Sequence, residues 1–199
     1  MRTIALCAVA LLIAFAIGRL SAQDFQPSCL LCPSTYISAS EFAEYEQIGR
    51  ATRVTDQQVR SLDVGKTNVQ VALLHRGKLD APAPRSVAEH DLVSEVYYIL
   101  SGSATNVTGP EMIGQERRPA DDRAVRLLNG PGSNAAEIHD GATHELKQGD
   151  VLVIPAGTGH QFTKIDDHIT YLMIRIDPDK VVPLMDESAS RAYLEENAQ

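Results

Sequence analysis

Hydrophobic and polar positions alternate with a period of two through the middle of the chain. Between residues 68 and 177 this β-type pattern occurs in short runs separated by turn residues: VQVALLH, EVYYILSGSATNV, DVLVIP and ITYLMIRI. No helical pattern alternates with these runs, which favours antiparallel pairing over a parallel α/β sheet. We therefore predict an all-β fold, a small antiparallel β-barrel over residues 68–177.

The pattern changes to a helical period on either side of this region. Ser38 lies three residues before Glu41, the spacing of a capping box, and apolar residues then recur at helical intervals to about Arg50. A second short helix is predicted near residues 188–194. The predicted organisation is an N-terminal extension (23–67), the barrel (68–177) with an insertion at about 109–147, and a C-terminal helical tail (178–199). Within the insertion we expect strands at 124–128 and 143–146.

The first 22 residues have the pattern of a secretory signal peptide. Arg2 precedes an apolar run from Ile4 to Ile17, and Leu20-Ser21-Ala22 is a small-residue cleavage pattern. The alternative is a retained membrane anchor, but the run is shorter than the roughly 20 residues that a spanning helix needs. We expect cleavage after Ala22, a secreted or periplasmic protein, and no membrane association after cleavage.

Charge disfavours nucleic acid as a partner. The chain has 26 acidic and 18 basic residues, a formal net charge of -8, whereas phosphate binding depends on clustered Lys and Arg. One basic cluster is present, and Asp121 and Asp122 interrupt it, so we interpret it as a solvated loop. Its members are Arg117, Arg118, Arg123 and Arg126.

Two cysteines, Cys29 and Cys32, remain after removal of the predicted signal peptide. An oxidising compartment favours a local or intermolecular disulfide. A redox role would need a thioredoxin-like context, c-type haem attachment would need a His where Pro33 stands, and two cysteines are too few for structural zinc. Free thiols are the remaining alternative.

The candidate chemistry lies on two of the β-type segments. After the segment from Gly149 to Pro155, a tight reversal brings His160 to the start of the next strand. Upstream, His90 and Glu95 flank a short reversal, and alternation places Glu95 on one strand face with Tyr97. A buried carboxylate needs a partner. A cation shared with two imidazoles is such a partner, and this ligand set is the facial triad typical of non-haem Fe(II).

These segments resemble the two motifs of the cupin superfamily. The second motif, G-x5-P-x-G-x2-H-x3-N, is matched at Gly149, Pro155, Gly157 and His160, with Lys164 in place of the final Asn. The first motif, G-x5-H-x-H-x3-4-E-x6-G, is matched at His90, Glu95 and Gly102, whereas Pro82 replaces its leading glycine and Ala88 its first histidine. The resemblance implies a cupin-like double-stranded β-helix with a divalent metal ion (Fe, Mn, Ni or Zn) held by His90, Glu95 and His160.

Other residues are candidates for the same site. His75 could replace the missing histidine, although a core or rim position is the alternative. For His139, His144 and His168 we expect surface positions. Tyr97 is the candidate catalytic residue because a buried phenol beside Glu95 could donate to a substrate, with core packing as the alternative.

Three classes of function follow. The first is a metal-dependent enzyme acting on a small organic molecule, with dioxygenase, isomerase, lyase and hydrolytic chemistry all open. The second is a non-catalytic module that binds a sugar or another small molecule in a metal-free pocket. The third is an extracellular structural or partner-binding protein, which would assemble through its helical ends and cysteines, for instance as a homodimer.

Overall fold

The computed structural model describes residues 26–52 and 55–197, which fall into two units. The first unit ends at Cys32 and the second comprises residues 33–199. In the first unit Cys29 and Cys32 form a disulfide, so the local pairing is confirmed. The predicted signal peptide lies outside the described residues. Among the described residues, no helix has both the length and the hydrophobicity needed to cross a bilayer.

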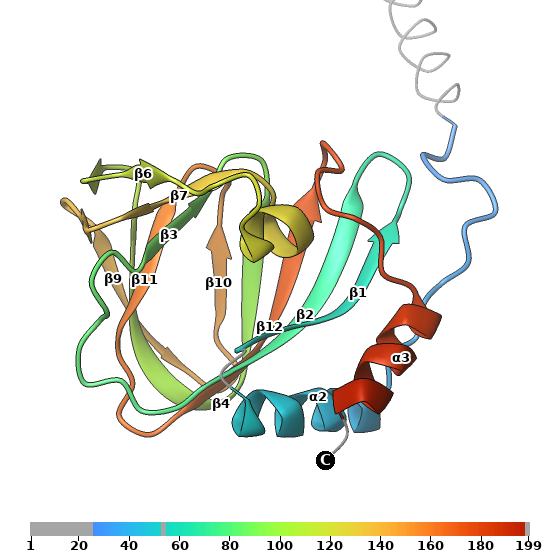
Figure 1. Cartoon of the computed structure of the whole chain (residues 1–199), viewed down its shortest axis with the longest axis horizontal. Coiled ribbons are helices and arrows are strands. Elements are labelled where there is room, and N and C mark those ends of the chain that lie inside the picture. Colours follow the sequence, from blue (N-terminus) through green and yellow to red (C-terminus); the bar gives the residue numbers. More distant parts are fainter. Residues whose placement is uncertain (1–25, 53–54, 198–199) are drawn as a thin grey trace, which may run out of the picture. The chain divides into compact units, whose positions relative to one another are not determined.

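The second unit is built on an antiparallel sheet, which confirms the predicted fold class (Figure 1). Its strand order is β1-β2-β12-β4-β11-β3-β7-β6, with β9 and β10 also paired to β4. Because β1 and β6 are the two ends of this order, the ladder does not close into a complete ring. The larger strands are β1 (Asp56–Asp63), β2 (Asn68–Arg76), β3 (Val87–His90), β4 (Ser94–Gly109), β7 (Gly132–Ala135), β9 (Ala142–Lys147), β10 (Val151–Ile154), β11 (Gly159–Lys164) and β12 (Ile169–Asp177).

Strand β4 joins the two halves of the sheet. Its first part pairs with β10 and β12, and its second part pairs with β9 and β11. Gly102 lies between these parts with a φ of 75°, and a Cβ there would lie 2.0 Å from the carbonyl oxygen of His168. A side chain is therefore excluded at this position. This close approach explains physically why the first motif ends on a glycine.

The two halves enclose one apolar core. The face of β4 that carries Glu95, Tyr97 and Ile99 is buried, and Tyr98 on the opposite face is 45% exposed, as alternation predicted. Strand β10 alternates in the same way: Leu152 and Ile154 are buried, whereas Val151 and Val153 are exposed. The core residues are Ala72, Leu74, Tyr97, Ile99, Ala104, Leu146, Leu152, Ile154, Phe162, Ile165, Ile169, Tyr171 and Met173.

Two helices pack beside β1 and β2: α2 (Ala39–Ala51) and α3 (Glu187–Asn197) (Figure 1). Both predicted helices are therefore confirmed. The Ser38 hydroxyl accepts a hydrogen bond from the Glu41 amide at 3.1 Å, as a capping residue does. The Glu41 carboxylate does not complete the capping box, because it pairs with the buried Arg60 of β1 at 2.6 Å. Tyr45 and Tyr193 stack between the helices with ring centroids 5.7 Å apart.

Strand β1 lies in the stretch that was predicted to be an extension before the barrel. It pairs with β2 along its length, and its polar residues Gln57, Arg60 and Ser61 are almost completely buried. Since these buried positions are polar, the stretch shows no hydrophobic alternation. The sheet therefore begins at Asp56.

The insertion folds differently from its predicted strands. The strand at 143–146 is confirmed as β9, but residues Ala124–Asn129 form a π-helix, η1, and not a strand. The residues around η1 contribute short strands that pair locally: β5 (Met112–Ile113), β6 (Glu116–Arg117) and β8 (Glu137–Ile138). Strand β6 pairs with β7, which in turn pairs with β3, so the insertion is attached directly to the strand that carries His90.

Candidate metal centre

Three side chains converge at one point inside the sheet. His90 ends β3, Glu95 is the second residue of β4, and His160 is the second residue of β11. His90 Nε2 lies 3.3 Å from Glu95 Oε1, and His160 Nε2 lies 3.4 Å from Glu95 Oε2. All three residues are less than 9% exposed. One potential ligand atom from each lies within 4.8 Å of the others, which is the spacing of a group that could hold a metal ion.

The strand pairing produces this convergence. Strands β3 and β11 are adjacent, and Ala88 is the register partner of His160. The turn after β10 is tied to β3, because the Gly157 amide donates to the His90 carbonyl at 2.7 Å. Gly157 adopts a φ of 81°, which favours glycine. The second motif therefore holds His160 in place partly through a backbone contact with the first.

His160 has the tautomer that a metal ligand needs. Its Nδ1 donates to the Thr158 carbonyl at 3.1 Å, so the lone pair of Nε2 points at Glu95. Burial lowers the pKa of His160 to about 4, because the charged imidazolium is poorly solvated there, although Glu95 acts in the opposite direction. His160 is therefore neutral near pH 7.

Glu95 has a protein cation as a partner. Arg175 of β12 is fully buried, and its Nε lies 3.4 Å from Glu95 Oε1 while its Nη2 pairs with Asp56. Tyr97 donates its hydroxyl to Glu95 Oε2 at 2.8 Å. Burial raises the pKa of Glu95, but His90 and Arg175 more than reverse this effect and hold the pKa well below its usual value. Glu95 is therefore ionised with or without a metal ion.

His90 is surrounded by hydrogen-bond donors from the insertion. Arg118 Nη1 lies 3.3 Å from its Nδ1, and Asn129 Nδ2 lies 3.1 Å from its Nε2 and donates to Glu95 Oε1 at 2.8 Å. A neutral imidazole accepts at one nitrogen only. Since Arg118 offers no acceptor, we assign the His90 proton to Nε2, where Glu95 Oε1 can accept it. Ligation of a metal through Nε2 would then require release of this proton and a weaker contact with Arg118.

Three further residues of the site carry no signal in the sequence: Arg118, Asn129 and Arg175. Arg118 was assigned to a solvated loop, and this is wrong: its three nitrogens contact Asn134, His90 and the Ser133 carbonyl. Arg117 is exposed, in agreement with the loop interpretation. Neither alternation nor motif spacing marks these residues, because their places depend on how the insertion folds back.

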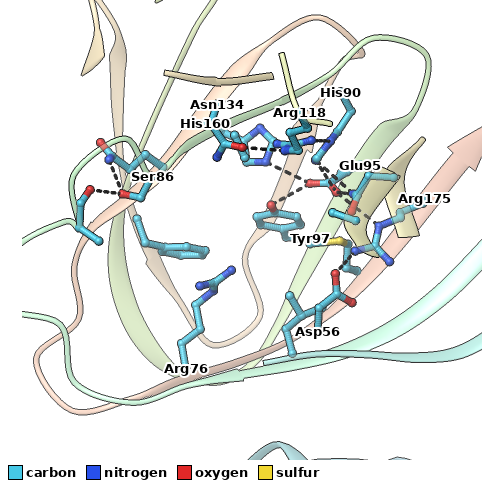
Figure 2. Close-up of a pocket in the computed structure, with 18 of the residues that line it drawn as sticks. Asp56, Arg76, Ser86, His90, Glu95, Tyr97, Arg118, Asn134, His160 and Arg175 are labelled. Carbon is cyan, nitrogen blue, oxygen red and sulfur yellow. Dashed lines mark hydrogen bonds and ion pairs between the residues drawn. The ribbon is translucent and has the colours of Figure 1, made fainter. Parts of the chain in front are cut away.

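The three side chains border a cavity of about 470 Å³, a size typical of small-molecule sites. Figure 2 shows His90, Glu95 and His160 grouped together, with Tyr97 next to Glu95 and Arg76 at the opposite side of the pocket in this view. Ala88 and His90 both border the cavity, because residues two apart on a strand share a face. The cavity lining includes Asp56, Leu74, Arg76, Ser86, Ala88, Tyr97, Arg118, Asn129, Asn134, Gln161, Phe162 and Arg175.

Tyr97 lies next to this group, whereas the other histidines considered from the sequence lie away from it. Tyr97 shares the face of Glu95, and its packing on Tyr171, with ring centroids 4.7 Å apart, fits a positioning role as well as a catalytic one. His75 does not border the cavity, and its Nδ1 contacts Thr170 at 2.8 Å. His139 is exposed, as expected. His144 and His168 are partly buried near the surface.

Comparison with known proteins gives a match to one family model. The AraC-like ligand binding domain matches residues 138–198, which include β9 to β12 and His160. No curated protein matches the sequence.

Solved structures with a similar fold are numerous. A Bacillus halodurans protein is 14% identical, over 81% of this chain and 97% of that chain, with a TM-score of 0.41. A Klebsiella pneumoniae protein with a double-stranded β-helix domain is 12% identical, over 77% and 99% of the two chains, with a TM-score of 0.41. A cupin protein from Bacteroides fragilis is 17% identical, over 78% and 86%, with a TM-score of 0.35. Similarity at this level transfers no activity or ligand to this chain.

Proposed function

We propose that this chain is a cupin-type protein and an exported metal-dependent enzyme that acts on a small organic molecule. The observation that carries the proposal is the convergence of the buried His90 Nε2, Glu95 and His160 Nε2 at the edge of a cavity. Two imidazoles and one carboxylate suit Fe, Mn, Ni or Zn and leave coordination positions open.

The donor atoms of the site fit a divalent metal ion. His160 already directs a lone pair at the centre of the group, and Glu95 is ionised, so only His90 must change its tautomer. A metal bound there would supply Lewis-acid chemistry, or redox chemistry in the case of iron.

Protein groups would orient the ligands and limit the access of water. The Thr158 carbonyl orients His160, and the Tyr97 hydroxyl orients the Glu95 carboxylate. Burial of these groups keeps their geometry fixed and their electrostatic interactions strong. Tyr97 is a positioning residue while it donates to Glu95, and it becomes a candidate proton donor when a substrate oxygen competes for its hydroxyl.

A metal-free binding module is the second candidate, and one observation favours it. Glu95 is already neutralised by the buried Arg175, and His90 accepts from Arg118 at Nδ1 and can donate from Nε2 to Glu95. The polar atoms of Glu95 and His90 therefore have hydrogen-bond partners without a bound cation. In this case the same cavity would recognise a small molecule through hydrogen bonds alone.

Elemental analysis tests the proposal. The protein is purified without chelator or an affinity metal, and its bound metals are measured; chelator-treated protein is then titrated with Fe(II), Mn(II), Ni(II) and Zn(II). We expect about one metal ion per chain in at least one of these experiments. Glu95→Gln, which removes the charge but keeps the shape, should weaken binding more than about 100-fold, because loss of a ligand exceeds the 10–100-fold typical of supporting residues.

His139→Ala is the matched control, since His139 is an exposed histidine away from the cavity. Its metal content should equal that of the parent. Absence of stoichiometric metal in purified and reconstituted protein would reject the enzyme proposal in favour of the binding module.

A further inference from the structure

The cavity contains three arginines, and they differ in what their guanidinium groups contact. Arg175 is held by Asp56, Glu95 and Gln58. The guanidinium nitrogens of Arg118 contact His90 of β3 and residues of β7. Both are therefore occupied by the protein itself. Arg76 is different.

Arg76 ends β2, and its side chain has only one hydrogen bond among the described residues. Its Nε donates to the Tyr171 hydroxyl at 3.1 Å, and its guanidinium carbon lies 5.2 Å from the centroid of the Phe162 ring. No described carboxylate lies within ion-pairing distance of it. Both Nη groups are thus left without a protein acceptor, and the guanidinium points into the pocket in Figure 2.

Two aromatic side chains, Tyr97 and Phe162, line the cavity together with Arg76 and the candidate metal ligands. Tyr171 contacts both Arg76 and the ring of Tyr97, and Tyr97 donates to Glu95. The Phe162 ring lies 6.2 Å from that of Tyr97 and nearly parallel to it. A ligand bound in the cavity would therefore meet a cation at one end, an aromatic wall along its length, and the metal centre at the other end.

We propose that Arg76 binds the carboxylate of a small organic acid, which makes such acids the substrate class of this protein. The two free Nη groups can donate to both carboxylate oxygens, the geometry that arginine favours. A single free guanidinium matches the single charge of a carboxylate better than a phosphate, which has nearly two charges. The assignment of the acid as substrate rests on the proposed function, whereas carboxylate binding at Arg76 does not.

Binding is tested in chelator-treated protein, so that the metal site does not contribute. Benzoate and acetate are titrated against the parent by NMR chemical-shift changes, each compared with its neutral amide, benzamide or acetamide, at constant ionic strength. We expect benzoate to bind at least about 10-fold more tightly than benzamide, since hydrogen bonds to charged groups contribute the larger share of polar recognition. Arg76→Gln should abolish that preference, and Arg76→Lys should retain part of it.

Arg191→Gln is the matched control, because Arg191 is an exposed arginine on α3 that pairs with Glu187. It should keep the preference, because Arg191 does not border the cavity. Circular dichroism establishes that each variant is folded. The inference is overturned if the parent shows no carboxylate preference, if folded Arg76→Gln and Arg76→Lys both keep the full preference, or if inorganic phosphate binds more tightly than both acids. If the parent binds no metal ion but still prefers carboxylates, the proposed function is overturned and the assignment of Arg76 is not.

Discussion

Two pairs of histidines lie close together in this protein, and only one of them resembles a metal site. The rings of His90 and His160 are 5.3 Å apart, and those of His75 and His168 are 5.7 Å apart. In the first pair, Nε2 of each ring points at one buried carboxylate, Glu95. In the second pair, Nδ1 of His75 contacts Thr170, and Nδ1 of His168 contacts Asp167 in its own loop.

The comparison shows that the direction of the nitrogen atoms matters more than the distance between the rings. Thr170 donates its hydroxyl to Glu46 at 3.2 Å, so His75 must donate to Thr170, and its bonds lead out towards α2. His160 donates from Nδ1 to the Thr158 carbonyl, so its unprotonated Nε2 faces the cavity. The first pair has metal-binding geometry because Nε2 of His90 and Nε2 of His160 face the same carboxylate, Glu95.

The largest expected difference between the two histidine pairs is in their effect on metal affinity. His160→Ala should weaken binding of the preferred divalent ion more than about 100-fold, because it removes a ligand and not merely a supporting residue. His75→Ala should leave the affinity unchanged, because its nitrogens do not face Glu95. Isothermal titration of chelator-treated protein measures both variants. Equal losses in the two variants would show that the metal site was assigned to the wrong histidines.

The pH dependence of stability should also differ between the pairs. The pKa of His160 falls from an ordinary 6.5 to about 4 in the folded protein, so the unfolded chain takes up the proton more readily. Metal-free protein should therefore lose stability as pH falls from 6.5 towards 4, by up to about 3 kcal/mol from this residue.

Denaturant unfolding at several pH values provides the measurement, and His160→Gln should show a flatter profile. Burial also lowers the pKa of His75, with Arg50 acting in the same direction, so His75→Gln should change the profile in the same sense. The effect should be smaller, because His75 has the smaller shift. A profile unchanged by His160→Gln would contradict the assignment of a buried neutral imidazole.

Ala88→His would extend the first pair to three imidazoles. Ala88 borders the cavity on the same face as His90 and is the register partner of His160, so the new ring would start beside the existing ligands. We expect metal affinity to rise about 10-fold through the added ligand. Thr170→His adds a ring beside His75 and is the comparison variant, with no gain expected. A folded Ala88→His protein without tighter binding would count against the metal centre.

The smallest expected effect concerns the tautomer of His90. Arg118 faces Nδ1 and so favours a proton on Nε2, which competes with metal ligation. Arg118→Gln should tighten metal binding by about threefold, because a Gln oxygen could accept from Nδ1 and leave Nε2 free. Arg117→Gln, at the exposed neighbour that pairs with Asp91, should have no effect. Weaker binding in Arg118→Gln would mean that Arg118 supports the site.

Local patterns in the sequence were enough to predict the strands that carry the ligands. Alternation along β4 separated the face of Glu95 from that of Tyr98, and the motif spacing placed His90, Glu95 and His160 together. Such predictions succeed because a strand has a fixed period and a buried face needs apolar residues. Strand β1 was missed for the converse reason, since it buries polar side chains such as Gln57 that find partners elsewhere in the fold.

The sequence by itself determined the all-β class, both flanking helices, and the three residues with metal-binding chemistry, because each depends on periodicity or spacing over a few residues. Only the tertiary structure decided what surrounds those residues. Arg118 and Asn129 reach His90 from the insertion, and Arg175 reaches Glu95 from β12, 80 residues later in the chain. These contacts follow from chain folding over long separations, where no period links one residue to its partner. The neutralisation of Glu95 and the free guanidinium of Arg76 are therefore properties of the folded molecule.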